Sequence, residues 1–435
     1  MMYDCLIECG KILIYKEGNF FCDSNKVIGV KEGKIAYLGE SCSDLKSKKV
    51  YHLKNHLVSP GLINTHTHLP MSLFRGLADN LSLKLWLEKY IFPLEREFVD
   101  EDFIKVGTKL SVIEMIRSGM TTCCDMYFYN KTLAEVLDES GLRAYVGIGF
   151  PSVEKDSKEW KQKSLNLRSE FKKHPRIQIA LAPHAPYTVE SQTLSEMSEF
   201  AKSEDFFLTI HVSESLWEQK EIQKRYHKTP VQYLHDLGVT GKKSLFVHCV
   251  HVNQKDLQIM SKTGTSFSYN PKSNMKLGNG IAPVGLALQE GVKVGLGTDG
   301  SASNNNLNFF EEMGTGARLQ ALKYGDQGLT AEEMFKIASI GGARSLALDK
   351  EIGSLELGKK ADIIALNLDS VDLHPFYNPI SLLVYTVLGH GLDFVMCEGK
   401  VLMEDFKIKV FNELEVLEES KVFSKRIQRF ISRKT

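Results

Sequence analysis

Short apolar runs alternate with longer amphipathic segments through the middle of the chain. Eight runs rich in aliphatic residues predict buried strands, and segments with apolar residues near helical spacing lie between them. The strands are expected at residues 57–64, 121–127, 143–150, 177–182, 206–211, 244–249, 265–269 and 292–297. Helices are expected at 100–118, 157–173, 189–203 and 215–237, with two more after Thr330. This alternation predicts an α/β fold, a TIM-like (β/α)8 barrel, whose typical size is ~250 residues.

A doubly wound open sheet is the alternative arrangement for alternating strands and helices. Its dinucleotide-binding form carries Gly-x-Gly-x-x-Gly directly after the first strand. No such motif follows the first predicted strand here, which favours the barrel.

Both ends of the chain have a different pattern, with short β-rich runs separated by Gly, Asn and Asp. Such runs occupy residues 11–15, 27–30 and 34–38, and others recur at 353–366 and 394–402. The N-terminal part alone is too short for a comfortable core. We therefore expect one composite β domain from residues 1–57 and 350–435, around a catalytic barrel at 58–349. The charged segment 413–433 is expected as a surface helix or as a subunit contact in a homo-oligomer.

Composition narrows the range of partners. Fifty-four basic residues balance fifty-four acidic ones among 435, so no overall charge favours nucleic acid or an anionic membrane. No apolar run is long enough to span a bilayer. The first residues carry no basic stretch typical of a signal peptide. Eight cysteines without Cys-x-x-Cys spacing indicate reduced residues in a cytoplasmic protein.

Candidate chemistry gathers where the predicted strands end. His66 and His68 are one residue apart, so on an extended strand both imidazoles face the same way. A lone His-x-His pair is weak evidence for a metal. Further candidates follow other strands: His184, His211, Glu214, His248, His251 and Asp299. Because a barrel forms its site at these strand ends, the set predicts a metal centre with additional acids and bases.

Several motifs in this set resemble the amidohydrolase superfamily, and more narrowly its mononuclear deaminase branch. They are Pro60-Gly-Leu-Ile-Asn-Thr-His-Thr-His68, His211-x-x-Glu214, His248 and Gly297-Thr-Asp-Gly-Ser-Ala-Ser-Asn304. Asn270-Pro-Lys-Ser-Asn274, Lys276-Leu-Gly-Asn-Gly-Ile-Ala-Pro283, Leu73-Phe-Arg-Gly76 and Phe92-Pro-Leu-Glu95 are similar to the 5'-methylthioadenosine/S-adenosylhomocysteine deaminases. The resemblance extends over nearly the whole chain.

The resemblance implies a role for each matching residue. His66, His68, His211 and Asp299 would bind one divalent metal, expected to be zinc. The fourth strand, 177–182, lacks the lysine that bridges two metals in binuclear relatives, which favours a single ion. The implied substrate contacts are Glu95, Arg143, His184, Glu214 and Asp299. Arg143 begins a strand, so a salt bridge is an equal alternative for it. Trp86 and Phe92 would line the pocket or simply pack in it.

These roles suit hydrolytic deamination. A bound cation brings the pKa of its water toward ~7. Asp299 would act as general base, Glu214 would protonate a ring nitrogen, and His248 would orient the attacking water or serve only as a structural histidine. The expected reaction converts the adenine ring of 5'-methylthioadenosine, S-adenosylhomocysteine or adenosine to the inosine-type product and ammonia. A hydrolase of guanine, a triazine or another amino-heterocycle is the alternative, and a non-catalytic scaffold is a third.

Overall fold

A computed structural model of the chain describes residues 2–40, 44–150 and 157–433. Eight parallel strands close into a barrel, in the order β10-β11-β12-β5-β6-β7-β8-β9. They are β5 (Leu62–Thr67), β6 (Met120–Tyr127), β7 (Arg143–Phe150), β8 (Ile177–Pro183), β9 (Phe207–Val212), β10 (Ser244–His248), β11 (Ser266–Tyr269) and β12 (Val294–Leu296). The predicted barrel is therefore confirmed.

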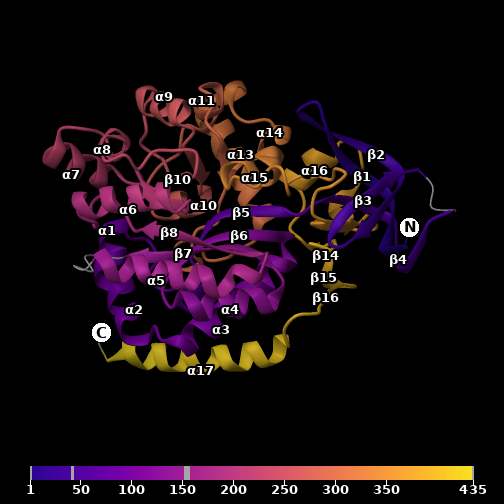
Figure 1. Cartoon of the computed structure of the whole chain (residues 1–435), viewed down its shortest axis with the longest axis horizontal. Coiled ribbons are helices and arrows are strands. Elements are labelled where there is room, and N and C mark those ends of the chain that lie inside the picture. Colours follow the sequence, from indigo (N-terminus) through magenta and orange to yellow (C-terminus); the bar gives the residue numbers. More distant parts are fainter. Residues whose placement is uncertain (1, 41–43, 151–156, 434–435) are drawn as a thin grey trace.

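Helices surround this barrel on its outer face (Figure 1). The longer ones are α3 (Glu101–Arg117), α4 (Asn130–Ser140), α5 (Ser157–Glu170), α6 (Ser191–Ser203), α7 (Leu216–Tyr226), α9 (Gln254–Thr263) and α13 (Phe309–Tyr324). Shorter ones are α1 (Leu83–Trp86), α2 (Phe92–Phe98), α8 (Pro230–Asp236), α10 (Pro271–Lys276), α11 (Val284–Gln289), α12 (Ser301–Asn304), α14 (Ala331–Lys336), α15 (Gly342–Ser345) and α16 (Pro379–Tyr385). Single turns are η1 (Leu69–Phe74), η2 (Leu87–Ile91), η3 (Phe171–Lys173), η4 (Gly325–Gln327), η5 (Ile337–Gly341) and η6 (Val371–Leu373).

The two termini build a separate eight-stranded sheet in the order β16-β15-β14-β13-β4-β1-β2-β3. Its strands are β1 (Met2–Lys16), β2 (Asn19–Lys31), β3 (Lys34–Gly39), β4 (Lys46–Pro60), β13 (Ile363–Asn367), β14 (Leu392–Cys397), β15 (Lys400–Glu404) and β16 (Lys407–Ile408). The N-terminal half joins the C-terminal half where β4 pairs antiparallel with β13. The prediction of one sheet made from both ends is confirmed.

The strand predicted at 57–64 is two strands, and Gly61 lies between them. β4 ends the terminal sheet at Pro60, and β5 begins the barrel at Leu62. A Cβ atom at Gly61 would lie 2.3 Å from Thr121 Oγ1, so a side chain is sterically excluded where the chain passes between the two bodies. The terminal sheet accordingly lies at the end of the barrel where its strands begin.

The helix predicted at 215–237 is also two helices. α7 ends at Tyr226, and His227 adopts a left-handed conformation with φ of 56°. Thr229 then caps α8 through a capping box with Gln232, and Pro230 occupies the first turn. The Thr-Pro pair is therefore the local signal for this break.

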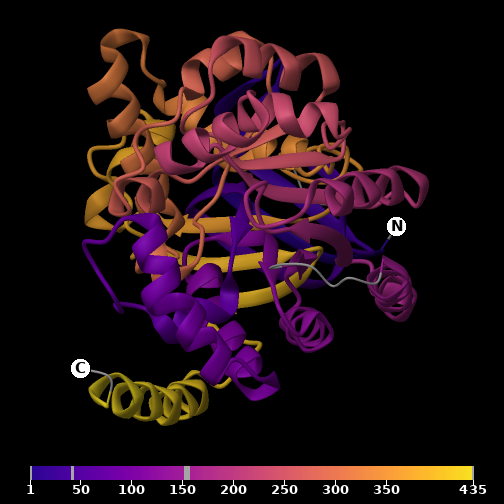
Figure 2. The same ribbon diagram turned by 90° about the vertical axis from the view of Figure 1, so that its left-hand side faces the viewer.

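The last helix, α17 (Glu413–Ser432), follows the terminal sheet in sequence but packs against the barrel. Phe423 and Phe430 pack edge-to-face against Phe103 and Phe98, with ring centroids 5.6 and 5.3 Å apart. Glu413 pairs with Arg117 of α3 at 2.7 Å. Figures 1 and 2 show the terminal sheet at one end of the barrel and α17 along its flank.

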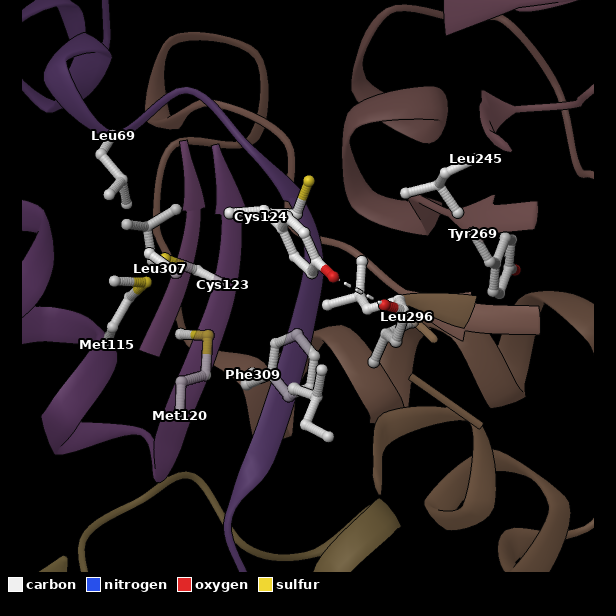
Figure 3. Packing of buried hydrophobic residues seen from close by; sticks show 14 of the residues in the cluster. Leu69, Met115, Met120, Cys123, Cys124, Leu245, Tyr269, Leu296, Leu307 and Phe309 are labelled. Carbon is white, nitrogen blue, oxygen red and sulfur yellow. Dashed lines mark hydrogen bonds between the residues drawn. The ribbon is translucent and has the colours of Figure 1, made fainter. Parts of the chain in front are cut away.

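One large apolar core fills the barrel and the space beneath its helices. Figure 3 shows part of it, with Met115 of α3 and Met120 and Cys123 of β6 among its members. Seven cysteines in the described ranges are free thiols. No helix in the part of the chain that the structure describes is long and apolar enough to cross a membrane.

Candidate active site

The four proposed metal ligands come together at the carboxyl ends of three barrel strands. His66 lies in β5 and His68 directly follows it, His211 lies in β9, and Asp299 follows β12. Asp299 Oδ1 is 3.5 Å from His66 Nε2 and 3.2 Å from His68 Nε2. His211 Nε2 is 3.2 Å from His66 Nε2. Three imidazole nitrogens and a carboxylate oxygen therefore surround one small space, as in a mononuclear transition-metal site.

His248 adds a fourth imidazole from the end of β10. Its ring nitrogen can form a group with those of His66 and His211 in which all atoms lie within 4.8 Å of one another. His248 Nε2 is also 3.8 Å from Glu214 Oε2 and 3.9 Å from Asp299 Oδ2. The imidazole of His248 therefore lies near the metal-ligand cluster and near Glu214 and Asp299, the two carboxylates with proposed roles in proton transfer.

Hydrogen bonds on the far side of these rings orient them toward the cluster. The Nδ1 atoms of His68 and His211 lie 2.5 and 2.8 Å from the carbonyl oxygens of Met126 and His184. A carbonyl oxygen only accepts, so each Nδ1 carries a proton, and in the neutral ring Nε2 presents its lone pair to a cation. This is the arrangement that metal-binding histidines require. The residues present therefore fit a zinc-type cation.

Burial favours the neutral form of most of these rings. It lowers the pKa of His66 to about 3 and that of His211 well below its ordinary value. His68 differs, because Asp299 outweighs the effect of burial and raises the pKa of that ring to about 9. Burial alone would raise the pKa of Asp299, but hydrogen bonds from His66 and His68 hold it well below the usual range. Asp299 is therefore ionised, as a ligand must be.

Asp299 presents its two carboxylate oxygens to different partners. Oδ1 faces the histidines and accepts the N–H of Gly300 at 2.8 Å. Oδ2 accepts hydroxyl hydrogen bonds from Ser273 at 2.6 Å and Ser303 at 2.9 Å. The backbone of Asp299 has φ of 62°, a conformation uncommon for residues other than glycine. The two serines thus hold the carboxylate in one orientation across the mouth of the barrel.

Glu214, just beyond β9, is buried and carries a perturbed carboxyl group. Its Oε1 accepts a hydrogen bond from Asn279 Nδ2 at 2.9 Å. Burial, followed by the negative charges of Asp299 and Glu218, raises the pKa of Glu214 well above its ordinary value. A carboxyl group that keeps its proton near neutral pH is suited to donate it to a substrate.

Three further buried acids hold the backbone around the site. Asp125 accepts the N–H of Leu69 at 2.6 Å, directly after His68. Glu218 accepts the N–H groups of Ser213 at 2.7 Å and Glu214 at 2.8 Å. Glu312 accepts the N–H of Lys272 at 2.9 Å and the side-chain amide of Asn304 at 2.7 Å. Each acid therefore fixes a segment that carries, or adjoins, a site residue.

A pocket opens beside the metal-ligand cluster, with about 830 Å³ of space not filled by protein atoms, part of which is open to solvent. Glu95 and His184, both expected as substrate contacts, line this pocket. Tyr127 donates its hydroxyl to Glu95 Oε1 at 2.9 Å. Removal from water raises the pKa of Glu95 to about 7. Trp86 and Phe92 also line this pocket, so both belong to its wall.

Residues 57–402 match the model of the Amidohydrolase family. The chain belongs to this family. It is 42% identical over 399 residues to a 5-methylthioadenosine/S-adenosylhomocysteine deaminase of Thermoanaerobacter pseudethanolicus, covering 90% of this chain and 92% of that protein. It is 39% identical over 394 residues to a 5'-deoxyadenosine deaminase of Methanothermobacter thermautotrophicus, covering 89% and 92%. The family resemblance expected from the motifs is confirmed.

A solved member of known metal content shares the same fold. The crystal structure of an adenosine deaminase from Xanthomonas campestris with bound zinc superposes with a TM-score of 0.94 at 29% identity. The match covers 98% of this chain and 99% of that one. Barrel and terminal sheet are therefore both parts of the family architecture.

Arg143 is the residue that the structure does not bring to the site. It begins β7, at the opposite end of the barrel from the pocket, and its side chain is only 3% exposed. Its guanidinium pairs with Asp362 at 2.5 Å and Glu398 at 3.3 Å, both contributed by the terminal part of the chain. Since active sites of barrels lie at the carboxyl ends of strands, the expected substrate contact is not formed here. The alternative of an ion pair agrees with this placement, although the pair is buried rather than on the surface.

Sequence reasoning missed the residues that support the site. Asn274 and Ser273 belong to the Asn270–Asn274 motif, and they contact His248 Nδ1 at 2.8 Å and Asp299 Oδ2 at 2.6 Å. Asn279 belongs to the next motif, so membership of a motif was the available signal for all three. Tyr127 and Glu218 lay outside the quoted motifs, and no pattern marked them.

Proposed function

We propose that this chain is a zinc-dependent aminohydrolase that deaminates the adenine ring of 5'-methylthioadenosine or S-adenosylhomocysteine. The observation that carries the proposal is the pocket, whose lining includes Glu95 and His184 together with His68, His211, Asp299 and Glu214, and burial raises the pKa of Glu214. The named activities of relatives at about 40% identity support it. The zinc in the related adenosine deaminase supports the choice of metal.

Each group has a distinct task in this reaction. A zinc ion held by His66, His68, His211 and Asp299 would supply water that ionises near neutral pH. Glu214 would donate its proton to a ring nitrogen as the water oxygen adds to the amino-bearing carbon. Asp299 Oδ2 would take up a proton from the attacking water, and His248 would hold that water in position. Asp299 would then pass its proton to the amino group, which leaves as ammonia when its C–N bond breaks, and the hydroxyl proton would return to Glu214 as the ring carbonyl forms.

Substrate binding would rest on Glu95 and His184, which line the pocket together with His68, His211 and Asp299. An ionised Glu95 can accept hydrogen bonds from both ribose hydroxyls, and Tyr127 holds one of its oxygens at 2.9 Å. His184 is oriented by Thr188, 3.0 Å from its Nδ1, which leaves Nε2 for the nucleoside. A free base has no ribose hydroxyls, so the contacts of Glu95 would favour a nucleoside over a free base.

The test is incubation of the zinc-loaded protein with 5'-methylthioadenosine, S-adenosylhomocysteine and adenosine. Absorbance should shift from adenine-like to hypoxanthine-like, with one ammonia released for each nucleoside. Guanine and an amino-triazine serve as free-heterocycle comparisons. No shift with any nucleoside, or faster turnover of a free heterocycle, would refute the substrate assignment.

Glu95→Gln provides the second part of the test, with Glu97→Gln on the same helix as its matched control. Glu97 is exposed and outside the pocket. Glu95→Gln should lower kcat/KM for nucleosides far more than for free bases, while Glu97→Gln should change neither. Equal losses for both substrate types would show that Glu95 does not read the ribose.

A further inference from the structure

The pocket combines titratable side chains with an apolar lining. The titratable residues that line it are histidines and acids: His68, His184, His211, His248, Glu95, Glu214 and Asp299, together with the phenols Tyr127 and Tyr187. Among its described lining residues there is no lysine or arginine. Any anionic part of a ligand would therefore meet no cationic side chain among these described lining residues.

The remaining wall is apolar and comes largely from one segment. Leu83 and Trp86 of α1, Leu87 and Ile91 of η2, and Phe92 of α2 face the pocket, as do Phe128 and Leu277. Trp86 Nε1 is a buried N–H without a hydrogen-bond partner among the described residues. That neutral donor can contact a sulfur or oxygen atom, but it does not neutralise a charge.

The nearest lysines are engaged elsewhere. Lys276, next to the pocket residue Leu277, pairs with Asp79 at 2.9 Å and donates to Asn305 at 2.7 Å. Lys84, in the apolar segment, lies over the ring of Trp217 at 5.2 Å from its centroid. Neither lysine lines the pocket.

The direction of the nucleoside follows from the two polar regions. On the proposed function, the purine ring reaches the metal ligands and Glu214, while the ribose hydroxyls reach Glu95. The 5' carbon then faces the lining that is left, which is the apolar wall. Burial of an unpaired charge is strongly unfavourable, whereas burial of a methyl or alkylthio group is favourable.

We infer that this site selects nucleosides with an uncharged, apolar 5' group, and that it discriminates against the zwitterionic homocysteinyl group. This inference rests on the proposed deaminase activity and narrows its substrate class. 5'-Deoxyadenosine and 5'-methylthioadenosine are the nucleosides of this class named among the relatives' substrates.

Steady-state kinetics of the zinc-loaded enzyme with four substrates tests this inference. 5'-Deoxyadenosine, 5'-methylthioadenosine and 5'-butylthioadenosine should have kcat/KM values within about tenfold of one another. S-Adenosylhomocysteine should fall about 100-fold or more below them, since its carboxylate finds no cation. The butylthio compound controls for length, because its chain is long but uncharged. A loss shared by the butylthio compound would mean that length decides, and would overturn the inference.

Two variants locate the effect in the apolar wall. Leu87→Lys should raise the kcat/KM ratio of S-adenosylhomocysteine to 5'-methylthioadenosine about tenfold or more, while Leu85→Lys, at an exposed position outside the pocket, should not. Equal activity of the unmodified enzyme on both substrates would overturn the inference and leave the deaminase proposal intact. If Lys84→Met then abolished the activity on S-adenosylhomocysteine, Lys84 would be the overlooked cation. Absence of turnover with all four substrates would refute the proposed function itself.

Discussion

Replacing Arg143 with methionine separates a structural role from the substrate contact that the family resemblance implied. Methionine keeps much of the side-chain volume but removes the charge. Arg143 and Asp362 are each only 3% exposed at the side chain, and Glu398 is 12% exposed. The substitution would leave Asp362 without its cation, whereas Glu398 would keep Lys360, with which it also pairs. Asp362 would keep the N–H of Glu398, which it accepts at 2.8 Å, but this bond does not balance the charge.

The expected cost is large because the ion pair is buried. Removal of one partner from a buried pair typically costs about 3–5 kcal/mol. Arg176→Met is the matched control at the same end of the barrel. Arg176 pairs with Asp138 at 3.5 Å, and both side chains are more than a fifth exposed, at 21% and 24%. A pair of that kind contributes about 0–1 kcal/mol.

Urea unfolding followed by circular dichroism measures this cost, and kcat/KM is measured at a temperature where both variants are folded. Arg143→Met should be strongly destabilised, with KM within about twofold of the unmodified enzyme, because Arg143 does not line the pocket. Adding Asp362→Leu should restore part of the stability, since the stranded charge is gone. A rise of tenfold or more in KM with unchanged unfolding would refute this reasoning and restore the substrate role.

Three further predictions concern the site itself. Asp299→Asn should retain zinc, measured by elemental analysis, while its kcat falls on the order of 10²–10⁴-fold. His211→Ala should lose both the zinc and the activity. Near-normal turnover of the zinc-loaded Asp299→Asn variant would exclude Asp299 as the proton acceptor. Glu218→Gln should lower kcat and shift the pH dependence of kcat with little change in KM, because one backbone N–H next to Glu214 loses its acceptor. An unchanged pH dependence of kcat would mean that Glu218 has only a structural role. The pKa of Glu95 is raised to about 7, so below that pH the carboxyl is protonated and KM for nucleosides should rise. This rise in KM should be absent in Glu95→Gln. A rise that persists in this variant would mean that another group titrates.

The barrel could be predicted because its strands are continuous apolar runs with polar reactive residues at their ends. The pattern of apolar residues does not show where one strand of the terminal sheet stops and a barrel strand starts, so residues 57–64 were expected as one strand. Gly61 is present in the sequence, but the reason that no side chain fits there is its contact with Thr121, which is distant in sequence. The same holds for Arg143, whose partners Asp362 and Glu398 come from the far end of the chain.

The metal ligands and Glu214 could be proposed from motifs, whereas the acids that support them could not. Glu218 and Glu312 look like ordinary helical acids in the sequence, because α7 and α13 both begin with acidic residues. Their burial depends on how each helix meets the barrel. A single sequence carries no information on which of several neighbouring acids turns inward.

The buried acids explain how strained strand ends can hold a fixed site. Ser213, His248 and Asp299 have positive φ values of 55°, 74° and 62°, each of which is unfavourable for its residue type. Glu218 accepts the backbone N–H of Ser213, which offsets part of that cost. Burial raises the pKa of Glu218 to about 7, and the backbone N–H groups that it accepts limit this rise by stabilising the carboxylate. The carboxylate and the strained loop therefore stabilise each other, and Glu214 is presented to the pocket as a consequence.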